Sequence, residues 1–235
     1  MADKESGPPK FGMGGNVTAN PPKSKEHERK SNELVTETFE DAPIPDLALS
    51  DKWTIWEQID SKNTKDYALT MEKVAWFGDI ITFWRVWNKI PHSDPKNFFS
   101  FNKEGKSYSN YYEVKGRDEK ISTLAMFKTG IIPAWEDAAN LEGGEYSNKL
   151  ETDKEKTFKI WNNLVFEIVS GNFPATDKIC GIRILDKGRL LKVELWVNYG
   201  LRKNCKQAGE QEARLIKICK EAGIENASFG FLSHG

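Results

Sequence analysis

The sequence predicts an α+β protein in which an antiparallel β-sheet carries three α-helices on one face. Two observations support this fold class. Some segments alternate apolar and polar residues with period two, and three others repeat apolar residues with helical period. With 235 residues, of which 38% are hydrophobic and 29% charged, the chain is long enough to bury one sizeable core.

The expected strands are rich in β-branched and aromatic residues and are bounded by turn formers. The turn at Asp186–Gly188 separates two of them, which should therefore form a hairpin. The full set is Trp53–Glu57, Tyr67–Met71, Ser122–Phe127, Ile179–Leu185, Leu190–Tyr199 and Ala227–Leu232.

The three expected helices have apolar stripes, and two have recognisable start signals. Asp79 is placed to cap the first helix, which should run to about Ile90. Thr152 and Glu155 have the spacing of a capping box at the start of the second. The third should occupy residues 203–222.

Composition changes along the chain and indicates its organisation. Residues 1–45 are rich in Pro, Gly, Lys, Glu and Asn, so this tail should be disordered. Residues 46–235 should form one domain, with a polar loop insertion at about 92–120.

Charge, cysteine count and hydropathy exclude several classes. With a net charge of −1, the protein as a whole does not attract nucleic acid electrostatically, so any contact with nucleic acid must depend on a local group of residues. Three cysteines without CxxC spacing indicate reduced thiols. No apolar run approaches a membrane span or a signal peptide, so we expect a cytoplasmic protein, with nuclear access left open.

Trp135 and Glu136, in the run Gly130-Ile-Ile-Pro-Ala-Trp-Glu-Asp, form the most informative pair. An aromatic ring stacks on an electron-poor base, and a neighbouring carboxylate accepts two hydrogens from one edge of it. Guanine offers such an edge, and methylation at N7 makes its ring cationic. For an isolated Trp-Glu pair, a core tryptophan beside a solvated glutamate is the commoner outcome, so the rest of the chain must decide.

The hairpin around residue 188 gathers cations. Lys192, Glu194 and Trp196 should share the face opposite the apolar one. With Lys187, Arg189 and Arg183, four cations are expected at one end of this hairpin. A solvated basic tip is the ordinary alternative to a phosphate site.

Trp84 lies at the edge of the apolar stripe of the first helix, where it would either pack or anchor a partner helix. Signals for an enzyme are weak, because the three histidines are scattered and no HExxH, CxxC or GxSxG element occurs. Glu136 and Asp137 form an adjacent acid pair, but on an extended strand they would point to opposite faces.

Taken together, these stretches resemble the eukaryotic translation initiation factor 4E family of messenger-RNA cap-binding proteins over residues from about 49 to 235. The stretches that carry the resemblance are Asp51–Trp56, Phe83-Trp84, Phe127–Asp137, Gly143-Gly144, Cys180-Gly181, Lys192–Trp196 and Ser233-His234. The resemblance implies a curved sheet with its helices on the convex face and the cap in the concave one.

Position by position, the resemblance implies three groups of site residues and no cofactor. Tyr67, Trp135, Glu136 and Trp196 would contact the methylated base, Lys187, Arg189 and Lys192 the phosphates, and Ile80, Trp84, Phe166 and Val169 would line a dorsal groove. That groove would bind scaffold factor 4G or 4E-binding repressors. The family commonly has Trp at the position of Tyr67, and its 4E-homologous repressor branch has Tyr.

We therefore expect a monomeric, non-enzymatic protein that binds capped messenger RNA, with 7-methyl-GTP as the minimal ligand, and recruits it to translation initiation. Three alternatives stay open. They are a cap-binding repressor, an interaction module whose cap site has decayed, and a nucleotide hydrolase that uses Glu136 or Asp137.

Overall fold

A computed structural model describes residues 47–59, 70–94, 99–101, 107–109, 121–187, 190–200 and 205–235. The expected tail at 1–45 and most of the insertion at 92–120 lie outside these ranges. Of the insertion, the described parts include a short antiparallel pair, β3 (Phe99–Phe101) and β4 (Ser107–Ser109).

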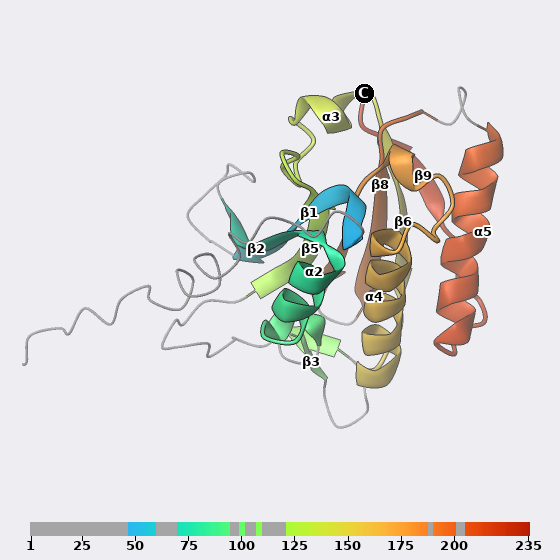
Figure 1. The fold of residues 1–235 in the computed structure, drawn as a ribbon. Helices are drawn as coiled ribbons and strands as arrows, with labels where there is room; N and C mark the ends of the chain where they lie inside the picture. Colours follow the sequence, from blue (N-terminus) through green and yellow to red (C-terminus); the bar gives the residue numbers. More distant parts are fainter. Residues whose placement is uncertain are drawn as a thin grey trace, which may run out of the picture.

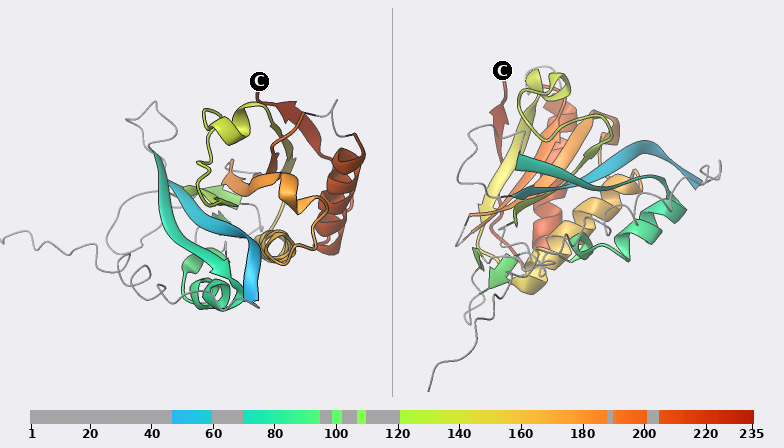
Figure 2. Two further views of the ribbon diagram at one scale, coloured as in Figure 1. Left: turned by 45° about the horizontal axis from the view of Figure 1, so that its top comes forward. Right: turned by 90° about the vertical axis from the view of Figure 1, so that its left-hand side faces the viewer.

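A seven-stranded sheet with the order β2-β1-β5-β7-β8-β6-β9 forms the centre of the protein. Every neighbouring pair is antiparallel, and the sheet is strongly twisted and curved (Figures 1 and 2). Its strands are β1 (Ala48–Ile59), β2 (Met71–Asp79), β5 (Ile121–Lys128), β6 (Gly144–Leu150), β7 (Ile179–Asp186), β8 (Leu191–Val197) and β9 (Gly230–Ser233).

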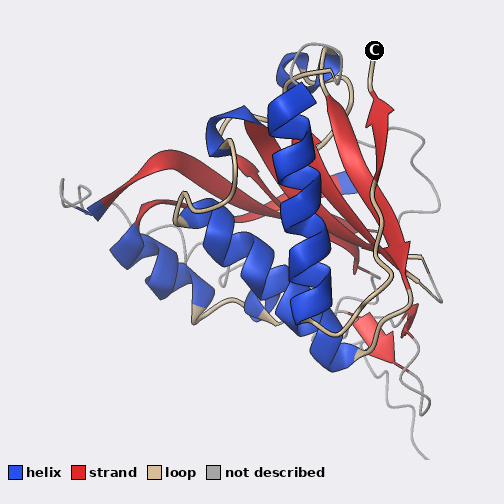
Figure 3. Cartoon of the chain, turned by 90° about the vertical axis from the view of Figure 1, so that its right-hand side faces the viewer, coloured by secondary structure: helices blue, strands red, loops and turns tan. Residues whose placement is uncertain are grey.

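Three longer helices cover one face of the sheet (Figure 3), which confirms the predicted fold class. They are α2 (Ile80–Trp87), α4 (Lys154–Val169) and α5 (Cys205–Glu221), while the short α3 (Ala138–Leu141) lies at the other face, beside the last strand. Single-turn 3-10 helices occur at Pro91–Ser93 and Thr176–Lys178. Among the described residues, no helix is both long and apolar enough to cross a membrane.

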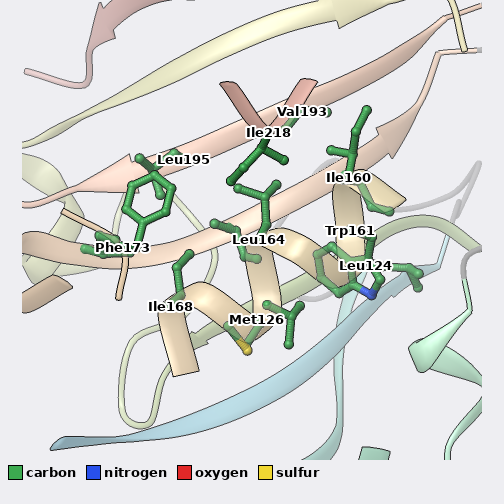
Figure 4. Packing of buried hydrophobic residues seen from close by; sticks show 14 of the residues in the cluster. Leu124, Met126, Ile160, Trp161, Leu164, Ile168, Phe173, Val193, Leu195 and Ile218 are labelled. Carbon is green, nitrogen blue, oxygen red and sulfur yellow. The ribbon is translucent and has the colours of Figure 1, made fainter. Parts of the chain in front are cut away.

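Successive side chains along each strand point to opposite faces of the sheet, and apolar side chains form a cluster on each face. On the helix side, Ile160 and Leu164 of α4 pack in one cluster with Met126 of β5 and Val193 and Leu195 of β8 (Figure 4). The opposite face holds a smaller cluster that consists of Trp56, Met71, Ala125, Phe127, Cys180 and Trp196. The face without the long helices is therefore also partly apolar.

Local capping explains where two helices begin. The Asp79 side chain accepts from the Thr82 amide at 2.7 Å, as predicted. In α4 the cap is Asp153, whose carboxylate accepts from Lys156 N at 2.9 Å, so the capping box predicted at Thr152 is wrong by one residue. Thr152 instead hydrogen-bonds the Thr157 hydroxyl.

Candidate functional site

Trp135 and Glu136 lie in the connection between β5 and α3, on the side of the sheet away from the long helices. Gly130, with φ +97°, adopts a backbone conformation that favours glycine and turns the chain out of β5. Trp135 is 54% exposed, and Glu136 is also exposed. Trp135 and Glu136 occupy a turn, and Asp137 caps α3, so the adjacent acids do not lie on an extended strand.

Side-chain hydrogen bonds fix this loop (residues 131–137) in place. Asp137 accepts from the amides of Ala139, at 2.9 Å, and Ile132, at 2.8 Å. The fully buried Asn140 donates from Nδ2 to the carbonyls of Ile132, at 2.9 Å, and Ala134, at 2.8 Å. The hydrogen bonds of Asp137 and Asn140 thus hold the loop that exposes the Trp135 ring to solvent. Sequence reasoning missed Asn140, whose only signal was its position three residues after a capping Asp.

His234 joins the last residues of the chain to the loop. Its ring centroid lies 6.1 Å from that of Trp135 and 4.4 Å from that of Trp196. Nδ1 is 3.0 Å from the Asn140 carbonyl, and because a carbonyl only accepts, Nδ1 carries a proton. Nε2 lies 3.8 Å from Glu145 Oε2.

Trp196 lies on the face predicted from period two, but it is buried. Its indole N–H donates to Glu194 Oε2 at 2.9 Å, and the Arg183 guanidinium lies 4.4 Å from the ring centroid. Gly181, paired with Trp196, faces the Phe127 ring so closely that a Cβ would lie 2.3 Å from it. A side chain here would displace Phe127, which contacts Trp196 edge to face.

A network of four charged side chains, which we call the ion network, lies beside Trp196. It consists of Arg183 on β7, Lys192 and Glu194 on β8, and Glu145 on β6. Lys192 Nζ is 2.7 Å from Glu145 Oε1 and 2.6 Å from Glu194 Oε1, and Arg183 Nε donates to Glu194 Oε2 at 2.6 Å. The β-ladders β7–β8 and β6–β8 place these groups side by side.

The two carboxylates of the ion network are almost completely buried, and the pKa of Glu145 reflects its neighbours. Burial alone would raise the pKa of Glu145, but the nearby His234 side chain and the hydrogen bond from Lys192 lower it from 4.5 to about 2. Burial would lower the pKa of Lys192, whereas hydrogen bonds to Glu145 and Glu194 raise it above its usual 10.5. Glu145 and Lys192 are therefore both charged at neutral pH.

The cation cluster predicted at the hairpin tip is only partly present in the described residues. Lys187 is exposed just after β7, whereas Arg183 is buried under Pro133, to whose carbonyl it donates at 3.2 Å, so its predicted place at the tip is wrong. Arg183 is paired in register with Glu194 on the adjacent strand, which sequence reasoning overlooked. Arg189 lies outside the described residues.

Tyr67 also lies outside the described residues. Trp56 and Trp76 are the alternative candidates for a second stacking ring. Trp76 on β2 is 42% exposed, while Trp56 on β1 is buried and has Lys73 Nζ at 5.2 Å from its ring centroid.

The predicted partner-binding residues lie on α2 and α4 in the helix layer. Trp84 is 45% exposed, and its ring centroid is 5.6 Å from that of the half-buried Phe166. Ile80 is also half-buried, and Val169 is buried in the core, so Val169 offers little surface to a partner. We call Ile80, Trp84 and Phe166 the dorsal patch.

Within the described ranges, no group of three or more His, Cys, Asp and Glu side chains could hold a metal ion. The carboxylate of Asp137 is engaged by the two amides that it caps. Glu136 and Asp137 therefore do not form a paired acid and base.

The helix-backed curved sheet, with an exposed tryptophan–glutamate pair on the face opposite its long helices, has the architecture of the 4E-like cap-binding fold class. The chain belongs to the eukaryotic initiation factor 4E family, because the model of this family, described as "Eukaryotic initiation factor 4E", matches residues 48–234.

Individual relatives agree with this assignment. Translation initiation factor 4E1 of Drosophila melanogaster is 27% identical over 154 residues, 65% of this chain and 50% of that protein. Factor 4E-1 of Zea mays is 23% identical over 217 residues, 91% of this chain and 85% of that protein. The chain spans about half the length of several curated relatives that it matches, the fruit fly protein among them.

Solved structures share the fold. C. elegans eIF4E-3, in complex with the 4E-binding protein Mextli and a cap analog, matches with a TM-score of 0.60 at 21% identity, over 80% of this chain and 92% of that chain. Schistosome eIF4E, complexed with m7GpppG and 4E-BP, matches with a TM-score of 0.59 at 21% identity, over 79% of this chain and 87% of that one.

Proposed function

We propose that this protein is a non-enzymatic, cytoplasmic factor that binds the 7-methylguanosine cap of messenger RNA and recruits it to translation initiation. The single observation that carries this proposal is the exposed ring of Trp135, held rigidly beside the exposed Glu136 carboxylate. A rigidly held indole ring that is open to solvent presents a flat apolar face on which a planar ligand can stack.

The chemistry of the pair fits a methylated guanine. A cationic planar base gains cation–π attraction as well as stacking on an indole ring. The adjacent carboxylate accepts from N1–H and the N2 amino group with two charge-assisted hydrogen bonds. A neutral base without two adjacent donors would gain neither benefit in full.

Relatives of known structure support this ligand class. Ascaris suum eIF4E-3 has been solved with m7G and with m2,2,7G caps, and the C. elegans and schistosome proteins with cap analogs. Two of these complexes also contain a 4E-binding protein. We assign the corresponding partner site of this chain to the dorsal patch, which would receive the apolar face of a helix from scaffold factor 4G or from a 4E-binding repressor.

The proposal is tested by titrating 7-methyl-GTP and GTP against tryptophan fluorescence. Trp135→Ala should weaken 7-methyl-GTP binding by about 1–3 kcal/mol through lost stacking. Glu136→Gln should weaken it by roughly 1.5–3 kcal/mol through lost charge-assisted hydrogen bonds. Both residues are exposed, so the melting temperature should not change.

A matched control is Glu142→Gln, an exposed glutamate at the end of α3. It removes the same charge and should leave both affinities as in the wild type. Equal affinity of the wild type for GTP and 7-methyl-GTP would refute the base assignment.

One observation favours an alternative, an interaction module whose cap site has decayed. Trp196 is buried, and Lys192 is already paired with two carboxylates. Retention of the protein on immobilised 7-methyl-GDP distinguishes the two, because the interaction module should pass through the resin while still binding a helical peptide at Trp84.

A further inference from the structure

We propose that this protein recognises the base of its ligand and draws little affinity from the phosphate chain, because Glu145 and Glu194 neutralise Arg183 and Lys192, the two described cations beside Trp196. This inference rests on the proposed function and specifies its ligand class, 7-methylguanine nucleotides irrespective of phosphate number. Before His234 is counted, the ion network contains two cations and two carboxylates and has no net charge.

Most hydrogen-bond donors of the two cations in the ion network are already engaged by protein groups. Lys192 lies within 2.7 Å of one carboxylate oxygen from Glu145 and one from Glu194. Arg183 uses Nε and one terminal nitrogen for Glu194 and the other terminal nitrogen for the Pro133 carbonyl. Its flat face lies against the Trp196 ring.

A phosphate that bound Lys192 or Arg183 in place of its present partners would leave a buried carboxylate without a counter-charge. The side chains of Glu145 and Glu194 are 2% and 1% exposed, so water cannot replace a lost partner. An unpaired buried charge is strongly unfavourable, which makes this exchange costly. The raised pKa of Lys192 agrees with its commitment to the two carboxylates.

Among the described residues, Lys187 is the hairpin cation that remains exposed to solvent. An exposed charge pair contributes little and is screened by salt. We therefore expect each added phosphate to tighten binding by no more than about fivefold, the upper range for an exposed pair. A desolvated charge pair would instead contribute more than about 30-fold.

The decisive experiment uses the wild-type protein and three probes, the mono-, di- and triphosphate of 7-methylguanosine. Their dissociation constants are measured at two salt concentrations. The expected result is a shallow series and a log–log salt slope well below about 0.7, the value for one phosphate contact on a single strand. A steep series of more than about 30-fold per phosphate would overturn the inference and leave the proposed function intact. Failure of all three probes to bind would overturn both.

Glu145→Gln tests the cause, because glutamine keeps the shape of the side chain and removes its charge. Lys192 then keeps only Glu194, so the triphosphate should bind at least about tenfold more tightly while the affinity for the nucleoside stays constant. Glu225→Gln, an exposed glutamate in the turn after α5, removes the same charge and should change nothing. A folded Glu145→Gln protein with the wild-type phosphate series would refute the role of Glu145. If the variant does not fold, the wild-type series decides.

Discussion

Asn140 should control the position of Trp135 without touching a ligand. The proposed perturbation is Asn140→Ala, which removes both hydrogen bonds from Nδ2. Each is worth about 1 kcal/mol net. Both carbonyls keep a backbone donor, Ala134 N for Ile132 and Asp137 N for Ala134, so neither is left without a partner. The total destabilisation should be about 2 kcal/mol.

Part of this cost should appear as lost affinity. A loosened loop must be reordered when a base stacks on Trp135, so we expect 7-methyl-GTP to bind about 10-fold more weakly, equivalent to about 1.4 kcal/mol. Urea unfolding gives the stability, and a fluorescence titration of the folded protein gives the affinity.

Asn140→Asp is the matched control for shape. Its carboxylate has no hydrogens to donate to the two carbonyls, so it should be at least as damaging as alanine. The reasoning would be refuted by a variant that loses about 2 kcal/mol of stability and binds 7-methyl-GTP as tightly as the wild type. In that case Asn140 would support only the fold.

Three further outcomes are expected. Trp84→Ala should abolish binding of an amphipathic helical peptide while 7-methyl-GTP affinity and melting temperature stay unchanged; loss of all three would indicate a packing role instead. The folded-state pKa of Glu145, about 2, lies below its usual 4.5, so its stabilisation is complete above pH 4.5 and is lost as pH falls toward 2. The stability difference between wild type and Glu145→Gln should therefore shrink by on the order of 3 kcal/mol over that window, and a constant difference in acid-unfolding curves would contradict the assignment. Burial raises the pKa of the Cys180 and Cys219 thiols to about 12, so peptide mapping after alkylation at pH 8 should find both nearly unlabelled, and rapid labelling in the native protein would show that they are not buried.

Much of the fold could be predicted because its elements have strong periodic patterns. The alternation of apolar residues at Leu191, Val193 and Leu195 predicts β8 without further information. Strand β6 was not predicted, because Gly144–Leu150 looks polar and is ordered only by β8 and β9 on either side. Most of the strand predicted at Tyr67–Met71 lies outside the described residues, and the described strand β2 runs from Met71 to Asp79. The last strand begins at Gly230, not at Ala227.

The site was predictable where the sequence carries a compact motif and not where distant strands meet. Trp135 and Glu136 are adjacent, so one local run indicates both. The ion pair of Lys192 with Glu145 spans 47 residues and depends on the pairing of β6 with β8, which no local pattern reveals. The pair of Arg183 and Glu194 was different, because the hairpin register alone places them opposite each other.

The intrinsic fluorescence of the eight tryptophans can report binding at both faces of the protein. Five are buried, and three, Trp76, Trp84 and Trp135, reach solvent. Only these three indoles should be accessible to a collisional quencher such as acrylamide. Because Trp84 lies on α2 and Trp135 in the loop between β5 and α3, a docked helix and a stacked nucleotide should each shield a different share of the quenchable emission. If the losses of quenchable emission caused by the two ligands add up, the two faces bind independently. If the combined loss is smaller or larger than the sum, the difference measures the coupling between the two binding sites.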